Sequence, residues 1–129
     1  MSQYIDGFAH PIPTSRLDDY KRVVVKVAEI WKEHGALDYC EYIGDDLHRE
    51  STRSFTEMVN VDNDETVLFG WVVFESKESR DRVNELVAAD PRMTDLIQPL
   101  ISESQPIFAA HRMAYGGFRT LFKKELDWD

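Results

Sequence analysis

The sequence contains a single cysteine, Cys40, among its 129 residues. One cysteine excludes a disulfide within the chain and is typical of proteins from a reducing compartment such as the cytoplasm. The sequence also lacks an apolar run of membrane-spanning length, and its first residues carry neither the basic cluster nor the apolar stretch of a secretory signal. We therefore expect a cytoplasmic protein with no membrane partner.

Basic residues are scarce relative to acidic ones. The chain has 15 Lys and Arg against 24 Asp and Glu, a formal net charge of -9. The adjacent basic pairs, Lys21-Arg22 and Lys123-Lys124, lie far apart in the sequence and form no cluster. Because nucleic acid repels a surface of this charge, we expect no nucleic-acid partner.

Several recognisable catalytic and cofactor patterns are missing as well. The glycines follow neither a dinucleotide-binding nor a P-loop pattern, so no phosphate site is expected. Four histidines, His10, His34, His48 and His111, are scattered without the close spacing of metal ligands. No Ser-His-Asp or Cys-His set is recognisable, and Cys40 is interpreted as inert packing. The sequence predicts no metal and no cofactor.

The most apolar stretch present runs from Glu65 to Ser76. As a strand it places Val67, Phe69, Trp71 and Val73 on one face, and Leu68, Gly70, Val72 and Phe74 on the other. A strand that is apolar on both faces is covered on both faces. Something must therefore cover each side of this strand.

The remaining pattern predicts a sheet with helices. Strands are expected at residues 3–12, 36–43, 66–75 and 110–122, the first with a bulge or a close backbone approach at Asp6-Gly7. Apolar residues at helical spacing from Leu17 to Trp31 predict a helix that Thr14 or Ser15 caps and that ends at Gly35. A short helical turn is expected at 54–57. Further helices are expected at 77–89, capped by Ser76, and at 92–100, capped by Asp90 with Pro91 at the first helical position.

This order predicts an α+β, ferredoxin-like β-α-β-β-α-β domain covering residues 1–129, with an ordered core at about 3–122 and a frayed tail at 123–129. Its four-stranded antiparallel sheet would have both helices on one face and the first and third strands in the centre. The other face would be apolar and uncovered, so we expect a homodimer that packs two sheets face to face as a dimeric α/β barrel. Alternatively, the loop at 101–109 or the tail covers that face.

Several short motifs support a family resemblance. They occur in order between residues 4 and 118: Tyr4-Ile-Asp-Gly-Phe8, His34-Gly-Ala-Leu37, Gly44-Asp-Asp46, Ser76-Lys77 with Arg80-Asp81 and Asn84, Asp90-Pro-Arg-Met93, and Arg112-Met-Ala-Tyr-Gly-Gly-Phe118. Together they resemble the YbaA-like bacterial family, a domain of unknown function in the dimeric α/β-barrel superfamily. The resemblance implies the fold and the dimer, but no catalytic residues. The chain departs from the family by a longer loop at 100–110 and a longer C-terminal tail.

Asp6 and His10 are the candidate catalytic residues. Asp6 shares a strand face with Tyr4, Phe8 and His10, where it can act as a general acid or base. The structural alternative is that Asp6-Gly7 forms a bulge opposite Gly116-Gly117, with the carboxylate bonded to backbone amides. Histidine can act as a proton shuttle on the same face.

Trp71, Arg80 and Tyr115 are the candidate ligand-binding residues. Tyr115 precedes two glycines that leave room for a ligand stacked on its ring. Arg80 can clamp a carboxylate or phosphate, although Asp81 and Glu78 are equally able to pair with it. Trp71 and Tyr115 are alternatively core residues, and strand phase leaves open which face carries Trp71.

Glu41 has two possible roles. It shares a strand face with Tyr39 and Ile43 and can reach a pocket between sheet and helices. On an edge strand, however, a glutamate is more often solvated and discourages further strand addition. Burial of its side chain would decide between these interpretations.

Two functional hypotheses follow. The first is a homodimeric protein that binds a small molecule, or serves as an accessory protein, without assignable catalysis. The second is a cofactor-free enzyme of oxygenase, isomerase or dehydratase type, acting on a small organic substrate between sheet and helices. A buried carboxylate or imidazole that converges with another polar group in a pocket would favour the second.

Overall fold

A computed structural model describes residues 3–102 and 106–124. The elements run in the order β1 (Tyr4–Pro13), the 3-10 turn η1 (Thr14–Arg16), α1 (Leu17–Glu33), β2 (Asp38–Ile43), α2 (Phe55–Met58), β3 (Glu65–Phe74), α3 (Lys77–Ala88), α4 (Pro91–Ile101), the 3-10 turn η2 (Ala110–Arg112) and β4 (Ala114–Arg119). The predicted tail falls largely on residues 125–129, which lie outside the described residues.

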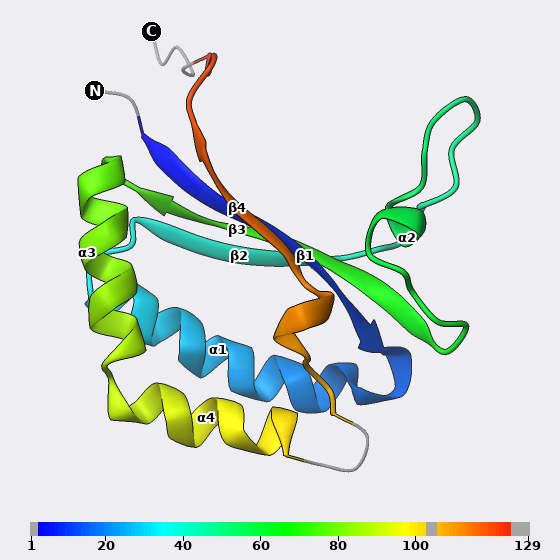
Figure 1. Cartoon of the computed structure of the whole chain (residues 1–129), viewed down its shortest axis with the longest axis horizontal. Helices are drawn as coiled ribbons and strands as arrows, with labels where there is room; N and C mark the ends of the chain where they lie inside the picture. Colours follow the sequence, from blue (N-terminus) through cyan, green and yellow to red (C-terminus); the bar gives the residue numbers. More distant parts are fainter. Residues whose placement is uncertain (1–2, 103–105, 125–129) are drawn as a thin grey trace, which may run out of the picture.

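The four strands form one antiparallel sheet in the order β2-β3-β1-β4 (Figure 1). The first and third strands are central, as predicted, and they pair over ten residues from Tyr4↔Phe74 to Pro13↔Glu65. The strict β-α-β-β-α-β order is not matched, because α2 lies between β2 and β3 and α4 follows α3. The last strand is also shorter than predicted, since 110–112 form a 3-10 turn instead.

The predicted bulge at Asp6-Gly7 is absent. Asp6 pairs with Val72 on one side and Gly117 on the other, and Gly7 continues both registers with Trp71 and Gly116. The Asp6 side chain bonds other side chains on the helix-covered face, so the carboxylate does not support a bulge through backbone amides. The strand tolerates Asp6-Gly7 because it is central and paired on both sides.

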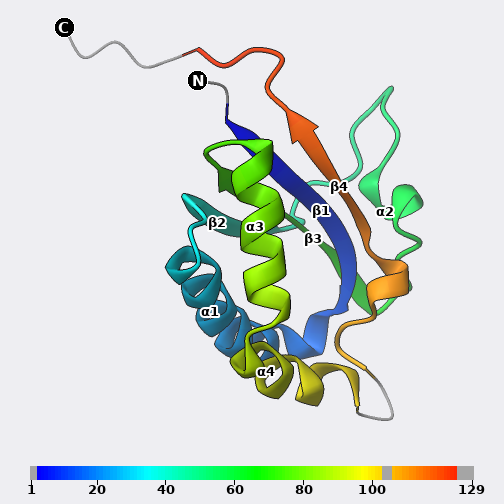
Figure 2. The ribbon, with the colours of Figure 1, turned by 60° about the vertical axis from the view of Figure 1, so that its left-hand side comes forward.

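Helices α1, α3 and α4 cover one face of the sheet, and α2 lies on the other (Figure 2). The predicted caps of α3 and α4 are confirmed: Ser76 accepts from Ser79 N at 3.0 Å and Asp90 accepts from Arg92 N at 2.9 Å. Gly35 follows α1 with a φ of 123°, a conformation that favours glycine. The cap predicted for α1 is wrong, because Thr14 and Ser15 form η1 and no side chain caps the helix at Arg16.

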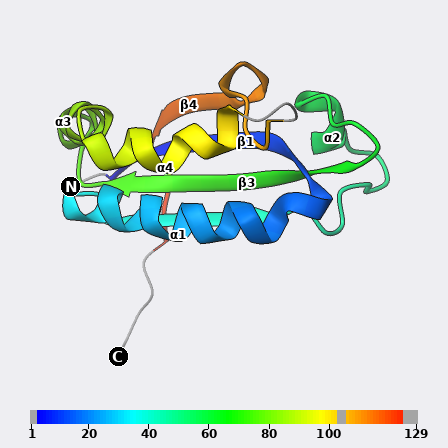
Figure 3. The same cartoon turned by 90° about the horizontal axis from the view of Figure 1, so that it is seen from below.

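The core fills the space between the sheet and the three helices. Phe8, Val72 and Phe74 pack against Val83 and Val87 of α3. A second cluster joins the sheet to α1, α4 and the segment after α4: Ile12, Tyr20, Leu68, Leu100 and Ile107. Figure 3 shows α1 and α4 side by side beneath the sheet. No helix within 3–102 or 106–124 is long and apolar enough to cross a membrane.

The face opposite α1, α3 and α4 carries only the four-residue α2 and is here called the helix-free face; the described residues cover it only at one end (Figure 2). There Val59, just after α2, packs on Ala9 and Val67. Over the rest of this face Phe69, Tyr42 and Phe118 are 42%, 59% and 58% exposed. The alternative in which the loop before η2 covers this face is wrong for its described part, because Ile107 is buried with Ile12 and Leu100 on the helix side.

Candidate functional site

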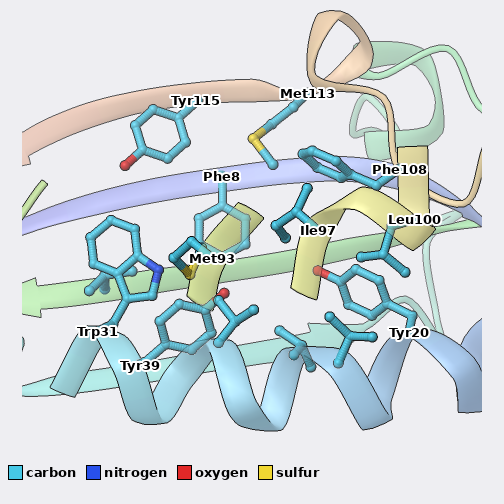
Figure 4. Close-up of a pocket in the computed structure, with 14 residues that line it drawn as sticks. Phe8, Tyr20, Trp31, Tyr39, Met93, Ile97, Leu100, Phe108, Met113 and Tyr115 are labelled. Atoms are coloured by element: carbon cyan, nitrogen blue, oxygen red, sulfur yellow. The ribbon is translucent and has the colours of Figure 1, made fainter. Parts of the chain in front are cut away.

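A cavity of about 260 Å³ lies between the sheet and helices α1 and α4. Its wall carries no charged side chain and is mostly aromatic or aliphatic (Figure 4). The polar atoms on it come from Tyr20 and Trp31 of α1, Tyr39 of β2 and Tyr115 of β4. An apolar pocket with a few polar atoms is the usual form of a small-molecule site.

At one end of the cavity, the hydroxyl of Tyr115 is hydrogen-bonded to the buried carboxylate of Asp6. The Tyr115 hydroxyl donates to Asp6 Oδ2 at 2.7 Å, and Arg80 Nε of α3 donates to Asp6 Oδ1 at 2.9 Å. Asn84 Nδ2 contacts the same carboxylate at 3.4 Å. Since Asp6 is fully buried, these bonds and the Arg80 charge offset the cost of removing it from water.

Gly117 makes this arrangement possible. It lies opposite Asp6 in the β1–β4 register, and a Cβ there would collide with Arg80 Nη2 and the Tyr4 hydroxyl. The guanidinium of Arg80 also lies 5.0 Å from the centre of the Tyr4 ring, within cation–π range. Gly117 therefore makes room for the side chain of Arg80 rather than for a ligand.

At the other end, Tyr20 and Tyr39 rest on the carboxylate of Glu41. Tyr20 donates to Glu41 Oε1 at 2.7 Å, and Tyr39 donates to Oε2 at 2.9 Å. His10 Nε2 lies 3.2 Å from the Tyr20 hydroxyl and 3.8 Å from Glu41 Oε1. The Glu41 side chain is 7% exposed and His10 is 1% exposed, so a carboxylate and an imidazole converge behind the cavity wall.

Glu41 also reaches a second cavity, of about 450 Å³, between α1 and β2. Tyr20 and Tyr39 line both cavities. The second one has the exposed side chains of Val25 and Ile43 on its wall, so it opens to solvent. The two hydroxyls and the carboxylate therefore form a polar connection between solvent and the inner cavity.

The hydroxyls of all three tyrosines on the cavity wall have raised pKa values. Burial, followed by the charge of Glu41, raises the pKa of Tyr20 and of Tyr39 well above the usual value of a phenol. Burial and the hydrogen bond to Asp6 raise the pKa of Tyr115 in the same direction. None of the three can therefore act as a tyrosinate base near neutral pH.

Phe8 lies between the two ends of the cavity. Its ring centre is 6.2 Å from that of Tyr115, with the planes 15° apart, and 6.3 Å from that of Tyr39. The His10 ring is stacked against it at 6.4 Å. The Asp6 and Glu41 clusters therefore share one aromatic ring at the cavity floor.

The structure brings most of the predicted site residues together. Asp6, Arg80 and Tyr115 form one cluster, and His10 belongs to the other. Arg80 pairs with Asp81 at 2.8 Å as well as with Asp6, and it does not face the cavity. Trp71 is not brought together with them, because it lies on the helix-free face and stacks with Tyr42 at 5.4 Å.

The sequence favoured a solvated Glu41 on an edge strand. The structure instead buries its side chain, which is 7% exposed. The signal in the sequence was Tyr39 two residues earlier on the same strand face, which places a hydroxyl beside the carboxylate. Tyr20 carried no such signal, since it reads as an ordinary position in the apolar stripe of α1.

His34 and His111 lie outside the Asp6 and Glu41 clusters. His34, at the C-terminus of α1, bonds Asp90 at 2.8 Å and so ties α1 to the start of α4. His111 lies in η2 instead of opening the last strand. Over the described ranges, no group of three or more His, Cys, Asp or Glu side chains is placed to hold a metal ion.

Comparisons with solved structures give only distant likenesses. A dimeric ferredoxin-like protein from an uncultured marine organism aligns with 98% of this chain and 100% of its own, at 9% identity and a TM-score of 0.49. The de novo designed protein Foldit4 aligns with 95% of this chain and 100% of its own, at 11% identity and a TM-score of 0.42.

Sequence comparisons are far more specific. The uncharacterized protein YbaA of Escherichia coli (strain K12) is 35% identical over 119 residues, which cover 92% of this chain and 97% of that protein. YbaA of Shigella flexneri matches to the same extent. The family model described as protein of unknown function (DUF1428) matches residues 3–103. The resemblance inferred from the short motifs is thus confirmed: the chain is similar to YbaA over 97% of that protein, and it belongs to the DUF1428 family.

Proposed function

We propose that this protein binds a small, mainly apolar organic molecule in the cavity between the sheet and helices α1 and α4. The observation that carries the proposal is an apolar cavity of about 260 Å³ into which three tyrosines and one tryptophan bring polar atoms. If this part of the core served stability alone, side chains would fill the space, because a cavity loses van der Waals contacts and lowers the free energy of unfolding. No cofactor is needed for such binding.

The experiment fills the cavity and measures binding of bicyclic probes. Naphthalene and 2-naphthol are titrated into the protein and followed by calorimetry or ligand-observed NMR. Val24→Phe adds a ring to the cavity wall, and Leu86→Phe on α3, at a position 43% exposed that lines neither cavity, is the control. We expect Val24→Phe to weaken binding of either probe at least about tenfold and Leu86→Phe to leave it unchanged. Failure of both probes to bind the wild-type protein, or equal binding to Val24→Phe, would contradict the proposal.

A second part of the proposal concerns assembly. We infer that two copies pack their helix-free sheet faces together as a homodimer of the dimeric α/β-barrel type. Support comes from the exposed aromatic surface of Phe69, Tyr42 and Phe118, which flanks Trp71 across three strands. Burial of such a surface is favourable at roughly 25 cal/mol per Å² of apolar area. The single cysteine and the acidic composition fit a cytoplasmic setting for this dimer.

A cofactor-free enzyme is the second candidate, and the Glu41 cluster favours it. A buried carboxylate with two tyrosine hydroxyls and an imidazole beside it, connected to a solvent-open cavity, can accept a proton from a bound substrate and return it. Isomerases and dehydratases need such a proton shuttle. Asp6 is less suited, because its carboxylate is paired with the guanidinium of Arg80, whereas over the described residues no lysine or arginine forms an ion pair with Glu41.

The test of this candidate is proton exchange at carbon. 2-Tetralone is an uncharged, enolisable bicyclic ketone whose enol has the shape of 2-naphthol. If Glu41 is the base, the protein accelerates deuterium incorporation from D₂O into 2-tetralone, and Glu41→Gln abolishes the acceleration while 2-naphthol still binds. Exchange no faster than in buffer would remove this candidate for that substrate class and leave binding as the function.

A further inference from the structure

We propose that the cavity selects an uncharged molecule that donates a hydrogen bond, through a hydroxyl or N–H group, to the phenol oxygen of Tyr39 in front of Glu41. This inference rests on the proposed function, because it names the class of ligand for the same cavity. The ligand would have a flat apolar body, and the same body bearing a carboxylate would be rejected.

The first step concerns where the tyrosine protons point. Tyr20 and Tyr39 donate to the two oxygens of Glu41 at 2.7 and 2.9 Å, and Tyr115 donates to Asp6 at 2.7 Å. A hydroxyl has one proton and two acceptor lone pairs. Toward the cavity, these three side chains can therefore offer lone pairs only, and the complementary ligand group is a donor.

The second step decides between the three oxygens. The Tyr20 oxygen already lies 3.2 Å from His10 Nε2, and Tyr115 belongs to the cluster in which Arg80 balances Asp6. The Tyr39 oxygen has no second partner among the residues the structure describes. In Figure 4 the side chains of Tyr20 and Tyr39 come from opposite sides, and their hydroxyls point toward one another. A ligand donor beside these hydroxyls meets Tyr39.

The third step concerns charge. Over residues 3–102 and 106–124, the only ion-pair partner of Glu41 is His10 at 3.8 Å, and no lysine or arginine lies within ion-pair distance of it. Charge–charge repulsion is strong where water is excluded. A ligand carboxylate that took the place of the donor would lie one hydroxyl away from Glu41, with no cation on the cavity wall to offset the repulsion. Anionic ligands are therefore disfavoured.

Trp31 offers a hydrogen-bond donor at a different point of the cavity wall. Its indole nitrogen faces Met93 in Figure 4, and within the described residues it has no hydrogen-bond partner. Its N–H can donate to a ligand acceptor. A molecule whose hydroxyl reaches Tyr39 and whose other polar atom, if any, accepts from Trp31 fits both groups.

The test compares three probes with the same bicyclic body: 2-naphthol, naphthalene and 2-naphthoate at pH 7, measured by calorimetry on the full chain. We expect 2-naphthol to bind about tenfold more tightly than naphthalene, the effect of one net hydrogen bond, and at least about tenfold more tightly than 2-naphthoate. Tyr39→Phe should remove the advantage of 2-naphthol over naphthalene. Glu41→Gln should raise binding of 2-naphthoate relative to 2-naphthol about tenfold or more.

Each outcome has a separate meaning. Naphthalene or 2-naphthoate binding as tightly as 2-naphthol overturns this inference and leaves the cavity proposal intact. Failure of all three probes overturns the cavity proposal and this inference with it. Should Glu41→Gln fail to fold by circular dichroism, Tyr39→Phe still decides, because an unchanged preference for 2-naphthol in that variant contradicts the role given to Tyr39.

Discussion

A buried aspartate in the middle of a central strand is the most demanding single residue of this chain. Asp6 is fully buried, and its two oxygens accept from Arg80 and Tyr115 at 2.9 and 2.7 Å. Breaking a buried ion pair by removing one partner is costly, because the other charge remains without compensation. The residue therefore links β1 to α3 and β4 at once.

Asp6→Asn should lower the free energy of unfolding by about 3 kcal/mol, measured by urea denaturation. The matched control is Asp81→Asn, since Asp81 bonds the same arginine at 2.8 Å but has a side chain 55% exposed. We expect the control to cost less than about 1 kcal/mol. Equal losses of stability in the two variants would contradict the structural role of Asp6. If Asp6→Asn folds but no longer binds 2-naphthol, Asp6 contributes to ligand binding.

Much of the site could not be predicted from the sequence, because it depends on contacts between side chains of different elements. Strand alternation correctly put Tyr4, Asp6, Phe8 and His10 on one face, because the period of two is fixed. The contact of Tyr20 with Glu41 joins a helix and a strand 21 residues apart, and it depends on how α1 is rotated over the sheet. No local pattern encodes that rotation, so the burial of Glu41 was left undecided.

At the scale of elements, helices and strands followed the sequence closely. The helix predicted from the Leu17–Trp31 stripe extends to Glu33, and the capping residues Ser76 and Asp90 start α3 and α4 as expected. The errors lie where tertiary contacts override local preference. Asp6-Gly7 is an unfavourable strand pair in isolation, but pairing on both sides and the Arg80 contact hold it extended.

Gly70 of β3 lies close to Phe8, which lines the cavity, and to Glu41. A Cβ there would come within 2.8 Å of Phe8 Cζ and 2.9 Å of Glu41 Cγ, and would also collide with the Cys40 carbonyl oxygen. Gly70→Ala should therefore destabilise the protein by about 2 kcal/mol, and displacement of Phe8 and Glu41 should weaken 2-naphthol binding. Gly116→Ala is the control, because its Cβ would meet only Phe118 at 3.9 Å. A neutral Gly70→Ala would mean that the floor of the cavity can shift at little cost.

The pairing of Glu65 with Arg112 ties the start of β3 to the turn before β4. Hydrogen bonds of 2.7 and 2.8 Å from Arg112 hold the pKa of Glu65 below its ordinary value. A group whose pKa is lower in the folded state adds stability above its unfolded pKa, near 4.3 for glutamate, and loses it as the pH falls.

Glu65→Gln should therefore cost about 1 kcal/mol at pH 7, and the difference from wild type should shrink as the pH falls below about 4. Denaturant titrations at several pH values measure it. Asp62→Asn is the control, since Asp62 lies 3.8 Å from the same arginine with a side chain 75% exposed. A Glu65→Gln cost that stays constant down to pH 3 would show that the charge is not its cause.

At the scale of the whole molecule, two opposing properties meet on the helix-free face. Each copy carries a net charge of -9, which opposes association, and an aromatic surface that favours it. The balance depends on salt, because added ions screen the repulsion and leave apolar burial in place.

The proposed homodimer should have twice the mass of the chain by light scattering at micromolar concentration, and should tighten as salt is raised. Phe69→Glu places a charge on a face residue that is 42% exposed and should give a folded monomer. Leu86→Glu, at a position on α3 with 43% exposure, is the control and should stay dimeric. A monomeric wild-type protein, or a Leu86→Glu variant that dissociates equally, would refute the interface.

The ring of Phe8 has a thermodynamic consequence. Because one rigid side chain contacts Tyr115, Tyr39 and His10, a shift at either carboxylate cluster changes the packing at the other. In a double-mutant cycle, Tyr115→Phe and Tyr39→Phe should be non-additive in unfolding free energy, and the cycle should become additive in a Phe8→Leu background. Additivity in the wild-type background would mean that the two ends respond independently. If the cycle is non-additive in the wild-type background, the cavity acts as one cooperative unit, and a molecule bound at the Glu41 end also alters the contacts of Asp6 with β4.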